Sequence, residues 1–173
     1  GSIVRWMHRE FPELQQTVIE INSAVIEAAH SYFDLPRDKR LRVLCADAAE
    51  MIPTLTDKFD LIILDAFGDY GPPEELTRIE FLHKLRGCLH DDSWLVGNLW
   101  TVTGDFKERR EQWKSTFNQV LGARANRKGN VILLGSQLSQ LPEKQQFETT
   151  AKILQKRHQI DFRKMLHELQ TVT

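Results

Sequence analysis

Three short apolar runs in the first 65 residues are each followed by an acidic residue. The runs span residues 17–19, 41–45 and 61–64, and the acids are Glu20, Asp47 and Asp65. Each run has the length of a buried strand, and a helix-like spacing of apolar residues comes after it. Strands that alternate with helices imply parallel pairing, because a crossover between parallel strands needs a covering helix. The sequence therefore predicts an α/β fold with a doubly wound, mostly parallel sheet.

The expected elements continue this alternation along the chain. Helices are expected over residues 3–11, 23–33, 48–55, 73–88 and 106–121, and strands over 17–21, 41–45, 60–64, 94–99, 123–127 and 131–135. Ser23 is expected to cap the helix that follows it. The last two strands, joined by Lys128, Gly129 and Asn130, are predicted to form a hairpin that sets an antiparallel strand at one edge of the sheet.

The end of the chain is strongly helical from residue 142 to residue 169. A basic helix that binds nucleic acid is one interpretation. We favour an amphipathic helix or helix pair with a solvated basic face, because Glu148, Asp161 and Glu168 dilute the positive charge. The predicted division is a nucleoside-binding α/β domain over residues 1–141 and a helical segment over residues 142–173.

Composition limits the partners. A chain of 173 residues can form one domain with a sizeable core, and its 23 basic and 24 acidic residues give no bulk attraction to nucleic acid or membrane. The two cysteines match neither a disulfide framework nor a metal-ligand spacing, and the six histidines show no ligand pairing. No apolar run has the length of a membrane span, and the first residues lack the order of a signal peptide. We therefore expect a cytoplasmic protein that binds no metal.

The acids at the strand ends predict a nucleoside site. An acid at the carboxyl end of a parallel strand points into the crevice where such sheets bind nucleosides, and it can accept both ribose hydroxyls. We assign this role to Glu20, with Asn22 beside it. Asp47 would accept a proton from the exocyclic amine of adenine, and the N–H of Ala48 would face a ring nitrogen. Asp65 would lie at the reacting end, where a carboxylate can take a proton from an attacking amine.

Each acid also has a structural interpretation. Asp47 could cap the helix that follows it, since aspartate is among the best capping residues. Glu20 could be an ordinary solvated strand end. Asp65 could start the turn that leads to Gly71 and Pro72, as aspartate commonly does before glycine and proline.

Several motifs together resemble the spermidine synthase (polyamine aminopropyltransferase) family, within the class I S-adenosylmethionine-dependent methyltransferase superfamily. They lie at residues 18–26, 32–36, 41–43, 46–48, 59–65 and 71–72. The resemblance implies a seven-stranded nucleoside-binding sheet and a sulfonium cofactor, either S-adenosylmethionine or its decarboxylated form. It also implies that Glu20 binds ribose, that Asp47 and Ala48 bind adenine, and that Asp65 accepts the proton of a polyamine amine.

The implied chemistry is coherent. An aliphatic ammonium group has a reference pKa of about 10, so the amine must lose a proton before it attacks the carbon beside sulfur. A nearby carboxylate attracts the cation and accepts that proton. The expected partner is a small-molecule acceptor such as a polyamine, and the chain could also pair as a homodimer.

The chain departs from the family pattern in three places. Where the family has Asp-Ser-Ser-Asp-Pro, this chain has Asp65-Ala66-Phe67-Gly68-Asp69, so Asp69 and Tyr70 become the candidate substrate ligands and Phe67 suits a less polar acceptor. Asn22 replaces an acid. Gly1 stands where a glycine-rich cofactor loop would end, so the first strand is expected to come from a longer chain or from another segment.

Two other functions stay open at this point. The chain could be a methyltransferase whose Phe67 and Tyr70 frame an aromatic acceptor. It could also be a non-catalytic nucleoside-binding or assembly module, which the missing loop and Gly68 would suit.

Overall fold

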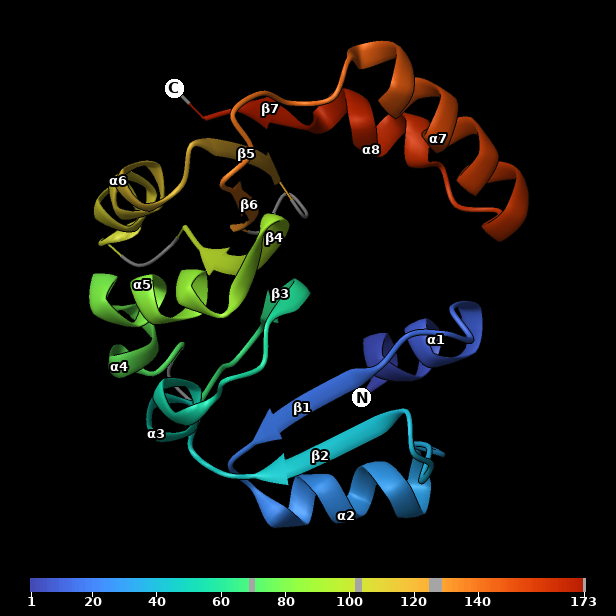
Figure 1. Ribbon diagram of the computed structural model, residues 1–173, viewed down its shortest axis with the longest axis vertical. Coiled ribbons are helices and arrows are strands. Elements are labelled where there is room, and N and C mark those ends of the chain that lie inside the picture. The colour runs from blue at the N-terminus through green and yellow to red at the C-terminus, as the bar shows by residue number, and fades with distance from the viewer. Residues whose placement is uncertain (69–70, 102–103, 125–128, 173) are drawn as a thin grey trace. The chain divides into compact units, whose positions relative to one another are not determined.

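The computed structural model describes residues 1–68, 71–101, 104–124 and 129–172. They form two compact units, Gly1–Leu55 and Thr56–Thr173, which are described separately here. Helices and strands alternate through both units, which confirms the predicted α/β class (Figure 1). The hydrogen-bonded ladders join two strands in the first unit and five in the second, whereas the family resemblance implies one seven-stranded sheet.

The first unit is built on two parallel strands. Its elements are α1 (Ser2–Glu10), β1 (Gln16–Glu20), α2 (Ser23–Tyr32), β2 (Leu41–Cys45), α3 (Ala48–Met51) and the 3₁₀-helix η1 (Ile52–Thr54). The register runs from Gln16 opposite Leu41 to Glu20 opposite Cys45, so both strands end at the same edge. The α2 helix lies along this pair of strands (Figure 1). The predicted parallel pairing and the bounds of β2 are confirmed here, whereas β1 begins and ends one residue earlier than the predicted range 17–21.

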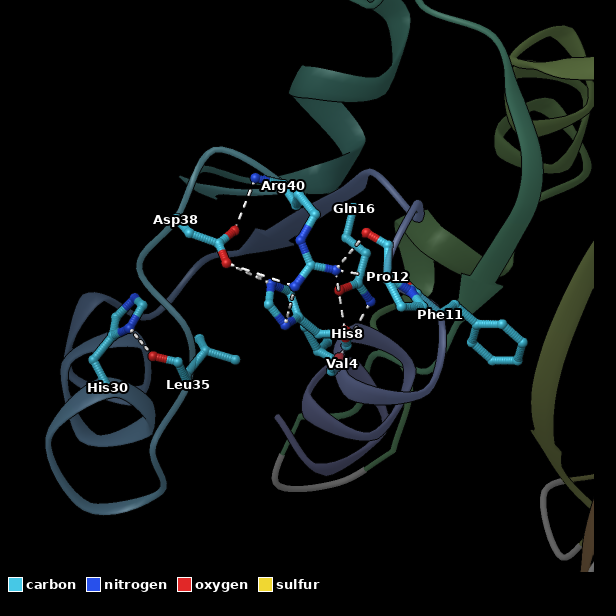
Figure 2. Close-up of polar contacts among 9 residues, drawn as sticks. All are labelled: Val4, His8, Phe11, Pro12, Gln16, His30, Leu35, Asp38 and Arg40. Carbon is cyan, nitrogen blue, oxygen red and sulfur yellow. Dashed lines mark hydrogen bonds and ion pairs between the residues drawn. The ribbon is translucent and has the colours of Figure 1, made fainter. Parts of the chain in front are cut away.

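The guanidinium group of Arg40 holds the turn between α1 and β1 (Figure 2). Its Nη1 donates to the carbonyl oxygens of His8 at 3.1 Å, Phe11 at 3.4 Å and Pro12 at 3.0 Å. These carbonyls lie at the end of α1 and just beyond it, where helix geometry leaves carbonyl groups without intrahelical partners. One side chain from the residue just before β2 therefore satisfies carbonyl groups at the end of α1.

The same cluster orients the half-exposed carboxylate of Asp38 (Figure 2). Arg40 Nη2 lies 3.0 Å from His8 Nδ1, and since a guanidinium only donates, Nδ1 accepts and the ring proton sits on Nε2. That Nε2 is 3.0 Å from an oxygen of Asp38. The backbone N–H of Arg40, followed by the His8 ring, lowers the pKa of Asp38 below its ordinary value.

The second unit contains a mixed five-stranded sheet in the order β3-β4-β6-β5-β7. The strands are β3 (Phe59–Leu64), β4 (Leu89–Trp100), β5 (Gln119–Arg124), β6 (Asn130–Ser136) and β7 (Gln170–Thr171). β3 and β4 are parallel, and β6 is antiparallel to both β4 and β5. The predicted hairpin is confirmed, but its expected place is wrong, because the antiparallel strand β6 lies between β4 and β5 and not at an edge.

Five helices belong to the second unit: α4 (Glu74–Thr77), α5 (Ile79–Gly87), α6 (Phe106–Thr116), α7 (Lys144–His158) and α8 (Phe162–Glu168). The single helix predicted over residues 73–88 is wrong in detail, since Arg78 has extended backbone angles that separate α4 from α5. The predicted C-terminal helix pair is confirmed, and α7 and α8 lie side by side (Figure 1). Among the helices described, none is both long enough and apolar enough to cross a bilayer.

The predicted helix over residues 106–121 is too long. It ends at Thr116, and Phe117 is already extended, with φ −118° and ψ 145°. The next buried residues, Phe117, Val120 and Leu121, fit a helical spacing as well as a buried strand, so periodicity alone could not separate the two. The strand expected over residues 123–127 therefore begins earlier, at Gln119, and its residues 125–127 lie outside the described residues.

The core of this unit lies between α6 and the sheet. Leu95 of β4 and Leu133 of β6 are fully buried on the face that α6 covers. Gly97 and Gly135 lie on that face, directly beneath the rings of Trp113 and Phe117. Alternate residues of β4, including Val96, Asn98 and Trp100, point to the other face and are only half-buried.

Candidate functional site

The first part of the candidate site lies at the end of the two strands of the first unit. Glu20 is the last residue of β1 and is half-buried. Its Oε1 accepts a hydrogen bond of 2.8 Å from the backbone N–H of Asn22, which holds the carboxylate at the strand end. Asp47 follows β2 by two residues, so the two predicted nucleoside ligands flank the same edge of this sheet.

Two of the predicted cofactor ligands cap helices. Asn22 Oδ1 accepts from the N–H of Ala24 at 2.9 Å, and Asp47 Oδ1 accepts from the N–H of Ala49 at 2.7 Å. The prediction that Ser23 caps α2 is wrong, because Ser23 is the first helical residue and Asn22 is the cap. For Asp47 the capping interpretation is confirmed. It uses one carboxylate oxygen and is compatible with a ligand on the other, so the predicted adenine contact stays a prediction.

Gly1 and Ala48 offer backbone groups only. Gly1 immediately precedes α1, and its carbonyl accepts from Arg5 N at 3.0 Å. Ala48 is the first residue of α3, and the first N–H groups of a helix have no acceptor within that helix. The assignment of these residues to a cofactor stays a prediction.

The second part of the candidate site lies in the second unit, where Asp65 follows β3. Its side chain is exposed, and its Oδ1 accepts a hydrogen bond of 3.0 Å from Nδ2 of Asn98 on β4. Asn98 Oδ1 accepts in turn from Nδ2 of Asn130, at 3.0 Å, from the start of β6. Neither asparagine was predicted to belong to the site. The available signal was that Asn98 is an amide near the carboxyl end of the otherwise apolar stretch 94–100.

Phe67, two residues after Asp65, and Trp100, the last residue of β4, form an aromatic pair. The rings of Phe67 and Trp100 are stacked, with centroids 5.2 Å apart and planes 23° from parallel. Gly71 lies against the Trp100 ring in a left-handed conformation, with φ 131°, that favours glycine, and its carbonyl accepts from Gly68 N at 2.7 Å. The predicted substrate ligands Asp69 and Tyr70 fall outside the described residues.

A small cavity lies behind this edge of the sheet, within the second unit. Its volume is about 40 Å³, and its lining includes Ala66, Pro72, Leu76, Arg109 and Trp113. A cavity of this size has room for a few water molecules, not for a nucleoside. The cavity alone therefore cannot be a nucleoside site.

The donor set fits an organic ligand better than a metal. Within residues 1–68, 71–101, 104–124 and 129–172, no three His, Cys, Asp or Glu side chains are grouped closely enough to hold a metal ion. Carboxylates at strand ends and backbone N–H groups at a helix start are the groups that bind ribose hydroxyls and an adenine edge. Glu20 and Asp47 belong to one unit and Asp65 to the other. Their convergence on one ligand stays a prediction.

Comparisons with known proteins agree with the resemblance of the motifs. The family model described as spermine/spermidine synthase domain matches residues 6–121. A polyamine aminopropyltransferase of Neisseria meningitidis serogroup A is 30% identical over 171 residues, which cover 96% of this chain and 64% of that protein. A polyamine aminopropyltransferase of Vibrio vulnificus is 29% identical over 159 residues, covering 89% of this chain and 52% of that protein. The chain thus spans about half to two-thirds of the length of these curated relatives.

Solved structures share the fold. Human methyltransferase-like protein 13, in complex with SAH, superposes with a TM-score of 0.83 at 22% identity, covering 90% of this chain and 76% of that chain. A probable spermidine synthase of Corynebacterium glutamicum gives a TM-score of 0.74 at 22% identity, covering 89% of this chain and 59% of that chain. These identities indicate the fold alone, which is the Rossmann-like fold of S-adenosylmethionine-dependent methyltransferases.

Proposed function

Because the chain belongs to the spermine/spermidine synthase domain family, we propose that it forms the cofactor-binding part of a transferase that alkylates an amine. The observation that carries the proposal is the exposed carboxylate of Asp65, held by Asn98 at the end of β3 and inside the segment that matches the family. The transferred group we favour is aminopropyl and the acceptor a polyamine, because the curated relatives are named polyamine aminopropyltransferases.

The residues of the chain have separate tasks in this proposal. Glu20 would bind the ribose diol, while Asp47 and the N–H of Ala48 would bind adenine. When bound, S-adenosylmethionine or its decarboxylated form supplies an electron-poor carbon beside sulfur, where an N–C bond forms as the C–S bond breaks with its electrons left on sulfur. Asp65 would bind the acceptor's ammonium group and take its proton, which frees the nitrogen lone pair.

Calorimetry with three ligands tests the cofactor. Decarboxylated S-adenosylmethionine should bind more tightly than S-adenosylmethionine if the chain belongs to an aminopropyltransferase. Methylthioadenosine, which lacks the transferable group, tests the nucleoside contacts alone. Glu20→Ala should weaken binding of all three by about 2 kcal/mol, since it removes a charged hydrogen bond. Binding of none of the three would refute the proposal and favour a non-catalytic module.

Turnover tests the role of Asp65. Incubation with putrescine and the decarboxylated cofactor should give spermidine, and Asp65→Asn should abolish that product while cofactor affinity stays within about threefold. The asparagine is isosteric and can still accept from Asn98, so the change removes the base with little disturbance of shape. Full activity of Asp65→Asn would show that Asp65 is not the proton acceptor.

A second candidate function is methyl transfer. The stacked rings of Phe67 and Trp100 favour it, because they present an apolar surface where a polycation would meet acids. A Drosophila melanogaster protein named eEF1A lysine and N-terminal methyltransferase homolog is also 24% identical over 108 residues. Tighter binding of S-adenosylmethionine than of its decarboxylated form would select this function.

A further inference from the structure

A chain of hydrogen-bonded side chains links three strands of the second unit. Asn130 Nδ2 donates to Asn98 Oδ1, and Asn98 Nδ2 donates to Asp65 Oδ1, each at 3.0 Å. Asp65 follows β3, Asn98 lies in β4, and Asn130 begins β6. The carboxylate is thus connected to a residue 65 positions further along the chain.

The register of the sheet produces this alignment. Leu64 pairs with Gly97 in the parallel ladder, so the next residues along each strand, Asp65 and Asn98, lie level and point to the same face. Trp100 pairs with Asn130 in the antiparallel ladder, which places Asn130 diagonally across from Asn98. Diagonal neighbours on one face of an antiparallel pair are within reach of each other. All three polar side chains therefore share the face opposite to the one that α6 covers.

The hydrogen-bond partners of Asn98 determine which way its side-chain amide is turned. An asparagine side chain offers an oxygen that accepts and a nitrogen that donates, and only the second suits a carboxylate. Since Asn130 donates to Oδ1 of Asn98, that oxygen is turned away from Asp65 and Nδ2 is turned toward it. A reversed amide would set its oxygen against the carboxylate.

We propose that Asn98, oriented by Asn130, is a positioning residue for the carboxylate of Asp65. Asn98 engages Oδ1, which fixes the plane of the carboxylate and leaves Oδ2 to receive the proton of the acceptor amine. This inference rests on the proposed function of Asp65 and adds two residues to it.

Nuclear magnetic resonance tests the contact without any turnover. The side-chain amide signals of Asn98, assigned by their loss in Asn98→Ala, should shift in Asp65→Ala. Asn118 is the matched control, because its Nδ2 donates to a backbone carbonyl, that of Gln137, at 2.8 Å in the same unit. Its signals should not move. Equal behaviour of the two amides would overturn the inference, whether or not the chain turns over the substrates named above.

Kinetics test the positioning role with Asn130→Asp. An aspartate at this position only accepts, so it should draw the Asn98 nitrogen toward itself and turn the amide oxygen to Asp65. With putrescine and decarboxylated S-adenosylmethionine, kcat should fall about tenfold or more, with the affinity for the cofactor unchanged.

Asn118→Asp is the control for these kinetics, since it makes the same chemical change away from Asp65. It should leave kcat per cofactor-binding chain unchanged. A role of Asn130 in folding alone would lower the fraction of chains that bind the cofactor without lowering kcat per binding chain. An unchanged kcat per binding chain in Asn130→Asp, or a loss matched by Asn118→Asp, would therefore overturn the inference. Absence of product from the wild-type chain, with the Asn98 signals shifting as expected, would count against the proposed reaction and not against the contact.

Discussion

Replacing Gly97 by alanine should destabilise the second unit, because α6 packs its aromatic side chains directly on the backbone of β4. A Cβ at this position would lie 2.6 Å from Cζ2 and 3.0 Å from Cη2 of Trp113, and 3.1 Å from Cδ1 of Leu99. Favourable carbon–carbon contacts are about 3.5–4.0 Å long. Trp113 is only 4% exposed, so its ring can move only into the small cavity that it lines.

Two effects of opposite sign determine the magnitude. Removing a glycine from a strand interior stabilises the fold by about 0.5–1 kcal/mol, since alanine loses less backbone entropy on folding. Forcing a methyl group into a packed core costs about 1–3 kcal/mol. The clash involves the rigid six-membered ring of a buried tryptophan and should prevail. We expect Gly97→Ala to lower the free energy of unfolding by roughly 1–2 kcal/mol.

Urea unfolding followed by circular dichroism measures this difference. Gly87→Ala is the control, because nothing lies within 4 Å of a Cβ added at that position in α5. Only the entropy effect acts there, so the variant should be as stable as the wild type or more stable by up to about 1 kcal/mol. Trp113→Phe removes the two ring atoms that clash, so Gly97→Ala should cost less in that background. Equal stability of Gly97→Ala and Gly87→Ala, or an unchanged cost of Gly97→Ala in the Trp113→Phe background, would refute the packing argument.

Two further predictions concern titratable groups. Asp38→Asn should remove a part of the folding stability that depends on pH. The Arg40 N–H, followed by His8, lowers the pKa of Asp38 in the folded chain below its ordinary value of 3.8. The ionised Asp38 therefore stabilises the fold above pH 3.8, and this stabilisation is lost as the pH falls through the lower pKa of the folded chain. Unfolding free energies of wild type and variant, measured from about pH 6 to about pH 3, should therefore converge at the acid end, and a constant difference would contradict this. Burial raises the pKa of the Cys88 thiol, so a disulfide reagent at neutral pH should label the exposed Cys45 in the folded chain and Cys88 only after unfolding. Labelling of both thiols at one rate would show that Cys88 is accessible.

The local elements could be predicted where the signals in the sequence are local. The strands that end at Glu20 and near Asp65 are bounded by polar residues, so their ends follow from the apolar runs. The end of α6 could not be predicted, because Phe117 and Val120 suit a helix and a strand equally well. The place of β6 beside β4 depends on a pairing between residues 30 or more positions apart, for which a single sequence carries no signal.

Some residues of the candidate site could likewise be predicted from the sequence, and others could not. Glu20, Asp47 and Asp65 could be assigned to strand ends because each directly follows, or closely follows, an apolar run. Asn98 and Asn130 could not be assigned, since their contact with Asp65 depends on the register of three strands. The role of Asp47 as a helix cap could be predicted as an alternative and is confirmed, whereas its contact with a ligand stays a prediction.

The reversed direction of β6 changes which connections border the end of the sheet at which Asp65 lies. In an all-parallel sheet, only the loops that leave the strands reach this edge. Here Gly129, the residue that directly precedes β6, lies at this edge as well. Its carbonyl accepts from Thr101 N at 2.6 Å and from Thr101 Oγ1 at 2.8 Å, next to the end of β4. Lengthening or shortening the β5–β6 connection would thus change the surroundings of Asp65 while the hydrogen bond between Asp65 and Asn98 keeps its place in the sheet.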